Sequence, residues 1–85
     1  MGPIHCTLRR VESSNLVACG YDRTQQILVV VFGGGATWAY EAVEPARWQG
    51  LVTAESKGRY LRDEVQAWRR GRKINPATIV QPEEE

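Results

Sequence analysis

The chain has few of the residues from which a metal centre or a covalent active site is normally built. It contains only two cysteines, Cys6 and Cys19, and one histidine, His5, which cannot complete a four-ligand zinc site without carboxylates from elsewhere. No pair of carboxylates has a spacing typical of acid–base catalysis, and no nucleophile has a positioned base. We therefore expect no metal, no cofactor and no catalytic activity.

Long hydrophobic runs are also missing. The first ten residues, MGPIHCTLRR, contain no apolar stretch of the kind that signal peptides have. No segment approaches the roughly 20 apolar residues that a membrane-spanning helix needs. We therefore expect a cytoplasmic protein with reduced thiols and no membrane partner.

The charge that is present is unevenly distributed. The formal net charge of the 85 residues is +1, but the last three residues are all glutamate, so the rest of the chain is more positive. Between Arg47 and Lys73 there are eight basic residues and three acidic ones. A locally cationic half of this kind suits an anionic partner.

Hydrophobic patterning predicts a β-meander in the first half of the chain. Residues 16–21 (LVACGY), 27–32 (ILVVVF) and 37–43 (TWAYEAV) are rich in β-branched and aromatic residues, as strands are. The three glycines at 33–35 are expected to join the second and third strands as a hairpin turn. They do not form a P-loop, because they lack that motif's downstream Lys-Ser/Thr and lead into a strand.

The second half of the chain has the spacing of helices. Pro45 is expected at the first position of a short helix, with Val43 and Trp48 packing together at its entry, and a second helix is expected from about residue 57 to 70. The prediction is an α+β fold: a three-stranded antiparallel β-meander followed by two α-helices in a single small domain. The chain divides into an N-terminal segment, this domain, and a C-terminal tail with an acidic tip, at residues 1–10, 11–73 and 74–85.

The second predicted helix has an apolar stripe beside a basic ridge. Leu61, Val65 and Trp68 are expected to be buried, and Gly71 to end the helix in a left-handed conformation. The ridge consists of side chains that fall within roughly a hundred degrees at the helical period: Arg59, Arg62, Gln66, Arg69, Arg70 and Lys73. Cations near a helix C-terminus are also stabilising for structural reasons alone, so both interpretations stand.

The start of this helix, SKGR, breaks the usual preferences of a first helical turn. Ser56 is a good N-cap, but Lys57 and Arg59 stand where acidic side chains are favoured, and Gly58 weakens a helix by up to about 1 kcal/mol. Local conflicts of this kind tend to mark functional sites. One interpretation is that these four residues form a cradle for a phosphate. The other is that both cations extend into water and Gly58 allows close helix–sheet packing.

Three segments resemble the KTSC domain, a small module named for the C-terminal extension of some lysyl-tRNA synthetases and also found as stand-alone bacterial and phage proteins. They are VESSNLVACGYD, WAYEAVEP and SKGRYLRDEV, between about Val11 and Val65. This chain departs from the family pattern in two places, with Trp38 where the family usually has a tyrosine and Leu61 at an often aromatic position. The synthetase context implies RNA binding. The family pattern also implies that three polar residues border the cradle: Ser13, Ser14 and Asn15.

Three classes of function follow from these features. The first is a non-catalytic module that binds a phosphate-bearing ligand, RNA or a nucleotide, with Trp38 and Tyr40 as stacking surfaces unless they belong to the core. A related alternative is a phage-type homo-oligomer that sequesters a small signalling nucleotide between subunits. The second is a protein-interaction domain, since both faces of strand 27–32 are apolar and either residues 74–80 or a second subunit must cover one. The third, an enzyme, is not expected.

We therefore predict a phosphate-ligand-binding module that forms a homo-oligomer. Its predicted ligand-binding residues combine basic, hydroxyl, amide, aromatic and glycine positions: Ser13, Ser14, Asn15, Trp38, Tyr40, Ser56, Lys57, Gly58, Arg59, Arg62 and Arg69.

Overall fold

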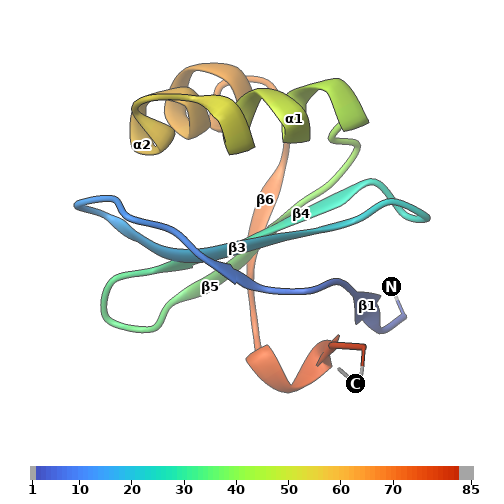
Figure 1. Cartoon of the computed structure of the whole chain (residues 1–85). Helices are drawn as coiled ribbons and strands as arrows, with labels where there is room; N and C mark the ends of the chain where they lie inside the picture. The colour runs from blue at the N-terminus through green and yellow to red at the C-terminus, as the bar shows by residue number, and fades with distance from the viewer. Residues whose placement is uncertain (1, 83–85) are drawn as a thin grey trace.

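A five-stranded antiparallel sheet forms the middle of the protein, with α1 and α2 on one side of it (Figure 1). The structure is a computed structural model that describes residues 2–82, so the expected acidic tip at residues 83–85 lies outside the described residues. The strands lie in the order β2-β3-β4-β5-β6. Their bounds, in this order, are Arg9–Arg10, Leu16–Asp22, Ile27–Phe32, Thr37–Tyr40 and Gly71–Ile74.

The predicted meander is the centre of this sheet, which is two strands wider than expected. β3, β4 and β5 pair antiparallel as predicted, and Val29 of β4 lies opposite Gly20 on one side and Ala39 on the other. β2 extends the sheet beyond β3, and β6 extends it beyond β5. The fold is therefore α+β, but its sheet has five strands instead of three.

Positive φ angles fix where several of these strands end. Gly34 and Gly35, with φ angles of 94° and 98°, form the turn between β4 and β5, as expected from the triple glycine. The third strand of the meander ends at Tyr40 instead of residue 43, because Ala42 has a φ angle of 57° and leaves the extended conformation. Gly71, expected to end a helix in a left-handed conformation, has no positive φ angle and begins β6 instead.

The helical layer covers one face of the sheet (Figure 1) and has three parts. They are α1 (Pro45–Thr53), α2 (Lys57–Tyr60) and the π-helix η1 (Leu61–Gln66), which directly continues α2. Within η1 the N–H of Ala67 donates to the carbonyl of Arg62 at 3.2 Å, an i→i+5 hydrogen bond. Both helices begin where the sequence predicts, but the second is shorter than predicted and changes its periodicity.

The wide turns of η1 decide which side chains of this helix face the core. Leu61 and Val65 are buried, as predicted, but Trp68 is 66% exposed, so its assignment to the buried stripe is wrong. A π-turn takes up one extra residue, so the side chains after it lag by roughly 100° relative to an α-helix. We attribute the exposure of Trp68 to this lag and to the end of the helix before it.

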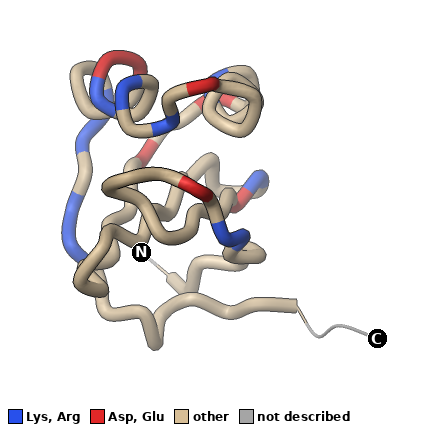
Figure 2. The backbone as a smooth tube through the Cα atoms, turned by 60° about the vertical axis from the view of Figure 1, so that its left-hand side comes forward, with Lys and Arg blue, Asp and Glu red and all other residues tan. Residues whose placement is uncertain are grey.

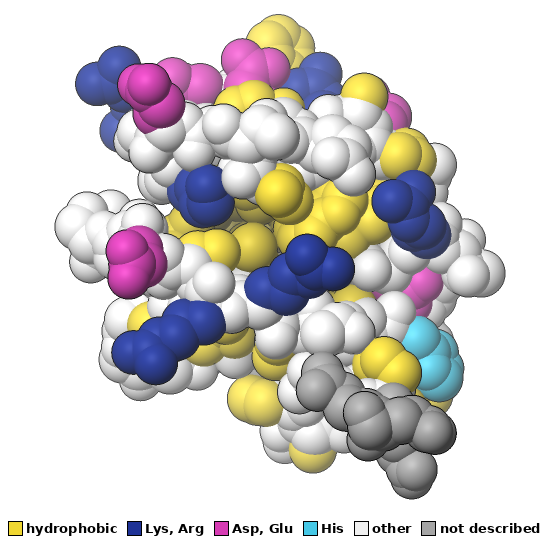
Figure 3. Space-filling model, in the orientation of Figure 1, with side chains coloured by type: hydrophobic (Ala, Val, Ile, Leu, Met, Phe, Trp, Pro, Cys, Tyr) yellow, Lys and Arg dark blue, Asp and Glu magenta, His cyan; other side chains and the backbone are white. Residues whose placement is uncertain are grey.

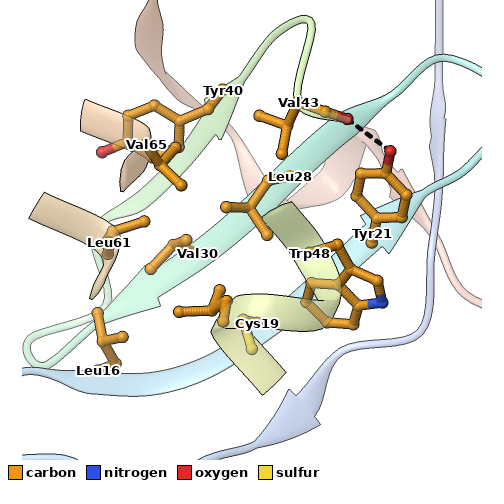
Figure 4. Close-up of a cluster of buried hydrophobic side chains, with 11 residues drawn as sticks. Leu16, Cys19, Tyr21, Leu28, Val30, Tyr40, Val43, Trp48, Leu61 and Val65 are labelled. Atoms are coloured by element: carbon orange, nitrogen blue, oxygen red, sulfur yellow. Dashed lines mark hydrogen bonds between the residues drawn. The ribbon is translucent and has the colours of Figure 1, made fainter. Parts of the chain in front are cut away.

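The main hydrophobic core lies between the helical layer and the sheet (Figure 4). Val43 and Trp48, predicted to pack at the entry of α1, both belong to it. Trp48 stacks on Tyr21 of β3, with ring centroids 5.5 Å apart and 10° between the planes. The hydroxyl of Tyr21 donates to the carbonyl of Val43 at 2.5 Å, the dashed line in Figure 4. These contacts fix α1 on the sheet and so position the rest of the helical layer.

The opposite face of the sheet is covered by the two ends of the chain. A short parallel pair, β1 (Ile4–His5) with β7 (Ile79–Val80), lies next to η2 (Pro76–Thr78). A second hydrophobic cluster joins sheet residues to residues of both ends. Its buried members are Ile4, Cys6, Ile27, Val29 and Ala39, and the partly buried Leu8, Ile74 and Ile79 pack against them. The second apolar face of β4 is thus covered within the chain. The homo-oligomer stays a prediction. The uncovered apolar face of β4 that suggested it is not present in the structure.

The buried carboxylate of Asp22 anchors the N-terminal segment. It accepts hydrogen bonds from the N–H of His5 at 2.9 Å, the N–H of Gln25 at 3.1 Å and the side-chain amide of Gln25 at 2.9 Å. Burial alone raises the pKa of Asp22, but these hydrogen bonds outweigh it and hold the pKa below its ordinary value. An ionised carboxylate therefore joins β1 to the turn between β3 and β4.

Candidate ligand-binding site

A polar cavity of about 370 Å³ opens between the turn that precedes β3 and the start of α2. This volume is within the range of small-molecule sites. Seven of the eleven ligand-binding residues predicted from the sequence line it: Ser13, Ser14, Asn15, Ser56, Gly58, Arg59 and Arg62. The structure thus brings the two polar motifs, SSN and SKGR, to one cavity, although forty residues separate them in the chain.

The SSN turn is held by backbone hydrogen bonds at both of its ends. The N–H of Val11 donates to the carbonyl of Val17 at 3.0 Å, and the N–H of Gly33 donates to the carbonyl of Asn15 at 2.9 Å. Within the turn, the hydroxyl of Ser13 accepts from the N–H of Asn15 at 3.4 Å. One wall of the cavity is therefore tied to both strand connections at this end of the sheet.

The opposite wall is the first turn of α2. Ser56 is the N-cap, as predicted, because its hydroxyl accepts a hydrogen bond from the N–H of Arg59 at 3.3 Å. A Cβ atom placed on Gly58 would lie 3.9 Å from the hydroxyl of Ser13 and 3.9 Å from the side-chain nitrogen of Asn15, which is ordinary contact. Close packing therefore does not require glycine at this position. Because Gly58 has no side chain, the backbone of α2 is uncovered within the cavity.

Lys57 has a structural partner and does not line the cavity. Its ammonium group donates to the carbonyls of Val52 and Ala54, both at 3.0 Å. These carbonyls lie at the C-terminal end of α1, where a cation is stabilising. The lysine that looks misplaced in the first turn of α2 is therefore well placed for the end of the preceding helix, and it extends toward α1 instead of into water.

Arg59 and Arg62 supply the positive charge at the cavity. The guanidinium of Arg59 is exposed and makes no hydrogen bond or ion pair within the part of the chain that the structure describes. Arg62 pairs with Asp63 at 3.1 Å, but their side chains are 67% and 52% exposed. A pair as exposed as this contributes little to stability, so Arg62 can exchange Asp63 for another anion at small cost.

Arg69, predicted to extend the charge, is held by the protein itself. Its guanidinium donates to the carbonyl of Ala42 and to the carboxylate of Glu44, each at 2.6 Å. The backbone N–H of Glu44, together with Arg69, holds the pKa of that carboxyl below its ordinary value. Arg69 therefore ties the end of the helical layer to the segment between β5 and α1.

The predicted basic ridge is not formed, because η1 ends after Gln66 and Lys73 belongs to β6. In Figure 2 the basic positions of the helical layer alternate with acidic ones. On the face drawn in Figure 3, Lys and Arg side chains are scattered singly around exposed hydrophobic side chains. Neither view shows a continuous basic stripe along the helices.

The two aromatic residues predicted as stacking surfaces have different environments. Trp38 and Tyr40 share the helix-facing side of β5, as the alternation of a strand predicts. Tyr40 is buried, at 4% exposure, and its hydroxyl accepts from the side-chain amide of Gln66 at 2.9 Å, so of the two alternatives left open for it, stacking surface or core, it belongs to the core. Trp38 is only partly buried. Both residues line a second cavity of about 420 Å³, together with Arg69.

Sequence reasoning missed two residues that line both cavities, Phe32 and Gln66. Phe32 lies at the end of β4 on the helix-facing side, where alternation from Leu28 and Val30 would have placed it. The position of Gln66 had no comparable signal, because the α-helical period assigned it to the basic ridge. In η1, with its i→i+5 hydrogen bonding, Gln66 reaches Tyr40 instead.

Residues 2–82 show no separate chemical centre. They contain no group of three His, Cys, Asp or Glu side chains arranged to hold a metal ion, and none of their helices is long and apolar enough to cross a membrane. Cys6 and Cys19 are free and buried. Burial, followed by the nearby charge of Asp22, raises the pKa of the Cys6 thiol to about 11. A thiol with so high a pKa is a weak nucleophile at neutral pH.

Several known proteins are similar to this chain. A protein of Tsukamurella paurometabola is 46% identical over 54 residues, which are 64% of this chain and 81% of that protein. A protein of Stutzerimonas stutzeri is 50% identical over 51 residues, which are 60% of this chain and 72% of that protein. The crystal structure of a KTSC domain protein from Yersinia pestis matches with a TM-score of 0.77 and 30% identity, over 82% of this chain and 99% of that one.

The family model of the KTSC domain matches residues 12–67. This range begins just before the SSN turn and includes SKGR, so it contains both walls of the polar cavity. The chain belongs to the KTSC domain family.

Proposed function

We propose that the protein is a non-catalytic module that binds a phosphate-bearing ligand, RNA or a nucleotide, in the cavity between the SSN turn and α2. The observation that carries this proposal is the lining of that cavity. It combines Arg59, whose guanidinium has no partner within residues 2–82, with hydroxyl and amide side chains and with the uncovered backbone of Gly58.

The chemistry of the lining suits a phosphate group. A guanidinium can donate two parallel hydrogen bonds to phosphate oxygens, and serine hydroxyls and the asparagine amide can donate others. None of the described residues that line the cavity is acidic, so no lining carboxylate repels an anion. Because Gly58 carries no side chain, a phosphate can approach the backbone there.

The test is a calorimetric titration at low salt with ribose 5-phosphate, AMP and a five-nucleotide RNA. The wild type is expected to bind at least one of them. Replacing Arg59 and Arg62 together by alanine is expected to weaken binding about tenfold or more per arginine, since a hydrogen bond to a charged group contributes about 1.5–3 kcal/mol. Arg70→Ala removes one positive charge from an exposed position outside the cavity and is expected to bind like the wild type.

Two results would contradict the proposal. One is the absence of binding by the wild type at millimolar concentrations of all three ligands. The other is a double variant that binds as tightly as Arg70→Ala. Lys57 is kept unchanged in these experiments because its contacts with the end of α1 make it a stability determinant.

A protein-interaction domain is the second candidate, and Trp68 is the observation that favours it. Its side chain is 66% exposed, and tryptophan is enriched at the centres of protein interfaces. Sedimentation at micromolar concentration tests self-association by the wild type and by Trp68→Ala. A monomer in both cases leaves no support for a homo-oligomer built on this residue.

A further inference from the structure

The polar cavity adjoins the second cavity, and the two differ in chemistry. They share the lining residues Phe32 and Gln66, so a ligand that occupied both would pass beside these two side chains. The first offers arginine and hydroxyl side chains, and the second offers the ring of Trp38. Resting on the proposed function, we propose that the two cavities together bind one free nucleoside monophosphate. Its phosphate lies at Arg59 and Arg62, its ribose beside Gln66 and its base against Trp38.

The second cavity has a rigid aromatic floor. Tyr40 is held there by its hydrogen bond from Gln66, and Gly71 leaves room for its ring, since a Cβ atom at that position would clash with the Cε1 atom of Tyr40. Trp38 packs against the main core and stays partly exposed beside Phe32. A fixed and partly open aromatic ring is the surface on which a base stacks, whichever base it is.

Gln66 is placed where the two cavities meet. Its side-chain nitrogen donates to Tyr40 at 2.9 Å, which orients the amide. Gln66 is an exposed residue, and its side-chain oxygen accepts no hydrogen bond from the described part of the chain. The ribose of a nucleotide lies between its phosphate and its base. A ribose hydroxyl can donate a hydrogen bond that this oxygen accepts.

A single nucleotide fits the observed charges better than an RNA chain does. An RNA backbone needs a basic track that follows its phosphates. Two neighbouring cations that could continue such a track are held internally: Lys57 by the end of α1, and Arg69 by Ala42 and Glu44. Among the described residues that line the polar cavity, the two cations are Arg59 and Arg62.

Calorimetric titrations with AMP, ribose 5-phosphate and a five-nucleotide RNA distinguish these ligands. Stacking on Trp38 is expected to make AMP bind roughly ten- to a hundredfold more tightly than ribose 5-phosphate. Trp38→Ala is expected to lower the affinity for AMP to about that for ribose 5-phosphate. Because Trp38 also contacts the core, Trp38→Leu, which keeps apolar packing without an aromatic ring, serves as the second variant. Thermal melts confirm that both variants are folded.

The outcomes separate this inference from the function on which it rests. Equal affinities for AMP and ribose 5-phosphate, both lost in the Arg59 and Arg62 double variant, would overturn the nucleotide inference and leave phosphate binding standing. Tighter binding of RNA than of AMP, with a steep salt dependence, would overturn it in favour of a nucleic-acid chain. Absence of binding by all three ligands would overturn both.

Discussion

Replacing Gly58 by alanine is expected to stabilise the protein. Gly58 lies within α2, where alanine favours the helix over glycine by up to about 1 kcal/mol. The added Cβ atom would lie 3.9 Å from its nearest neighbours, on Ser13 and Asn15, so no steric clash offsets this gain. For a domain of this size, a gain of about 1 kcal/mol raises the melting temperature by roughly 4–8 °C.

The same methyl group is expected to weaken ligand binding. It projects toward Ser13 and Asn15 across the polar cavity, so it obstructs a phosphate that approaches the backbone of α2. One carbon atom in a fitted pocket changes affinity by roughly tenfold or more, and we expect a loss of this size for AMP. A variant that is more stable and binds less tightly separates the effect on the site from any effect on folding.

Gly20→Ala is the matched control for the stability measurement. A Cβ atom on Gly20 would lie 2.7 Å from the backbone carbonyl oxygen of Thr7, which cannot move aside as a side chain can. Overpacking of this kind destabilises a protein by about 1–3 kcal/mol. Thermal and urea denaturation compare both variants with the wild type. A melting temperature of Gly58→Ala below that of the wild type, or unchanged affinity for AMP, would refute this account of Gly58.

Two further predictions concern stability. Trp48→Ala is expected to lower the free energy of unfolding by about 3–5 kcal/mol, because Trp48 is buried and stacked on Tyr21, whereas Trp68→Ala is expected to change it by less than about 0.5 kcal/mol. Equal losses in urea denaturation would show that Trp68 is buried. The pKa of Asp22 is lower in the folded state than its ordinary value of 3.8. The ionised carboxylate therefore stabilises the folded protein above pH 3.8, and this contribution is lost as the pH falls through the folded pKa. The stability difference between wild type and Asp22→Asn is therefore expected to shrink below about pH 4, and a constant difference in melts down to about pH 2 would contradict this.

The central strands could be predicted because their residues have only one suitable environment. The run from residue 27 to 32 is apolar and β-branched, and a sheet covered on both faces is the structure that buries it. β6 was missed because its residues, GRKI, include one apolar side chain and follow a helical pattern. Its pairing with β5 is made by the backbone, which leaves no mark on side-chain composition.

The candidate site was predictable to the extent that its residues conflict with local preferences or match a family pattern. Gly58 and Arg59 were singled out by the first rule, and Ser13 to Asn15 by the second, and the structure brings them to one cavity. Lys57 broke the same local rule for a different reason. Three residues separate the end of α1 from the start of α2, so a side chain at one helix start reaches the carbonyls of the preceding helix end. A residue can therefore oppose the dipole of its own helix while it stabilises the end of another.

The distribution of partners among the basic residues matters more for function than their number does. Arg47 is bonded to Glu44 and Glu64, Lys57 to the end of α1, and Arg69 to Glu44 and the carbonyl of Ala42. Each of these cations stabilises the helical layer. An outside anion could bind one of them only by first breaking hydrogen bonds that the fold uses. Arg59 has no such bond within residues 2–82, and Arg62 has only an exposed one. If the proposed function holds, we therefore expect an anion to bind where these two arginines meet the polar side chains of the SSN turn.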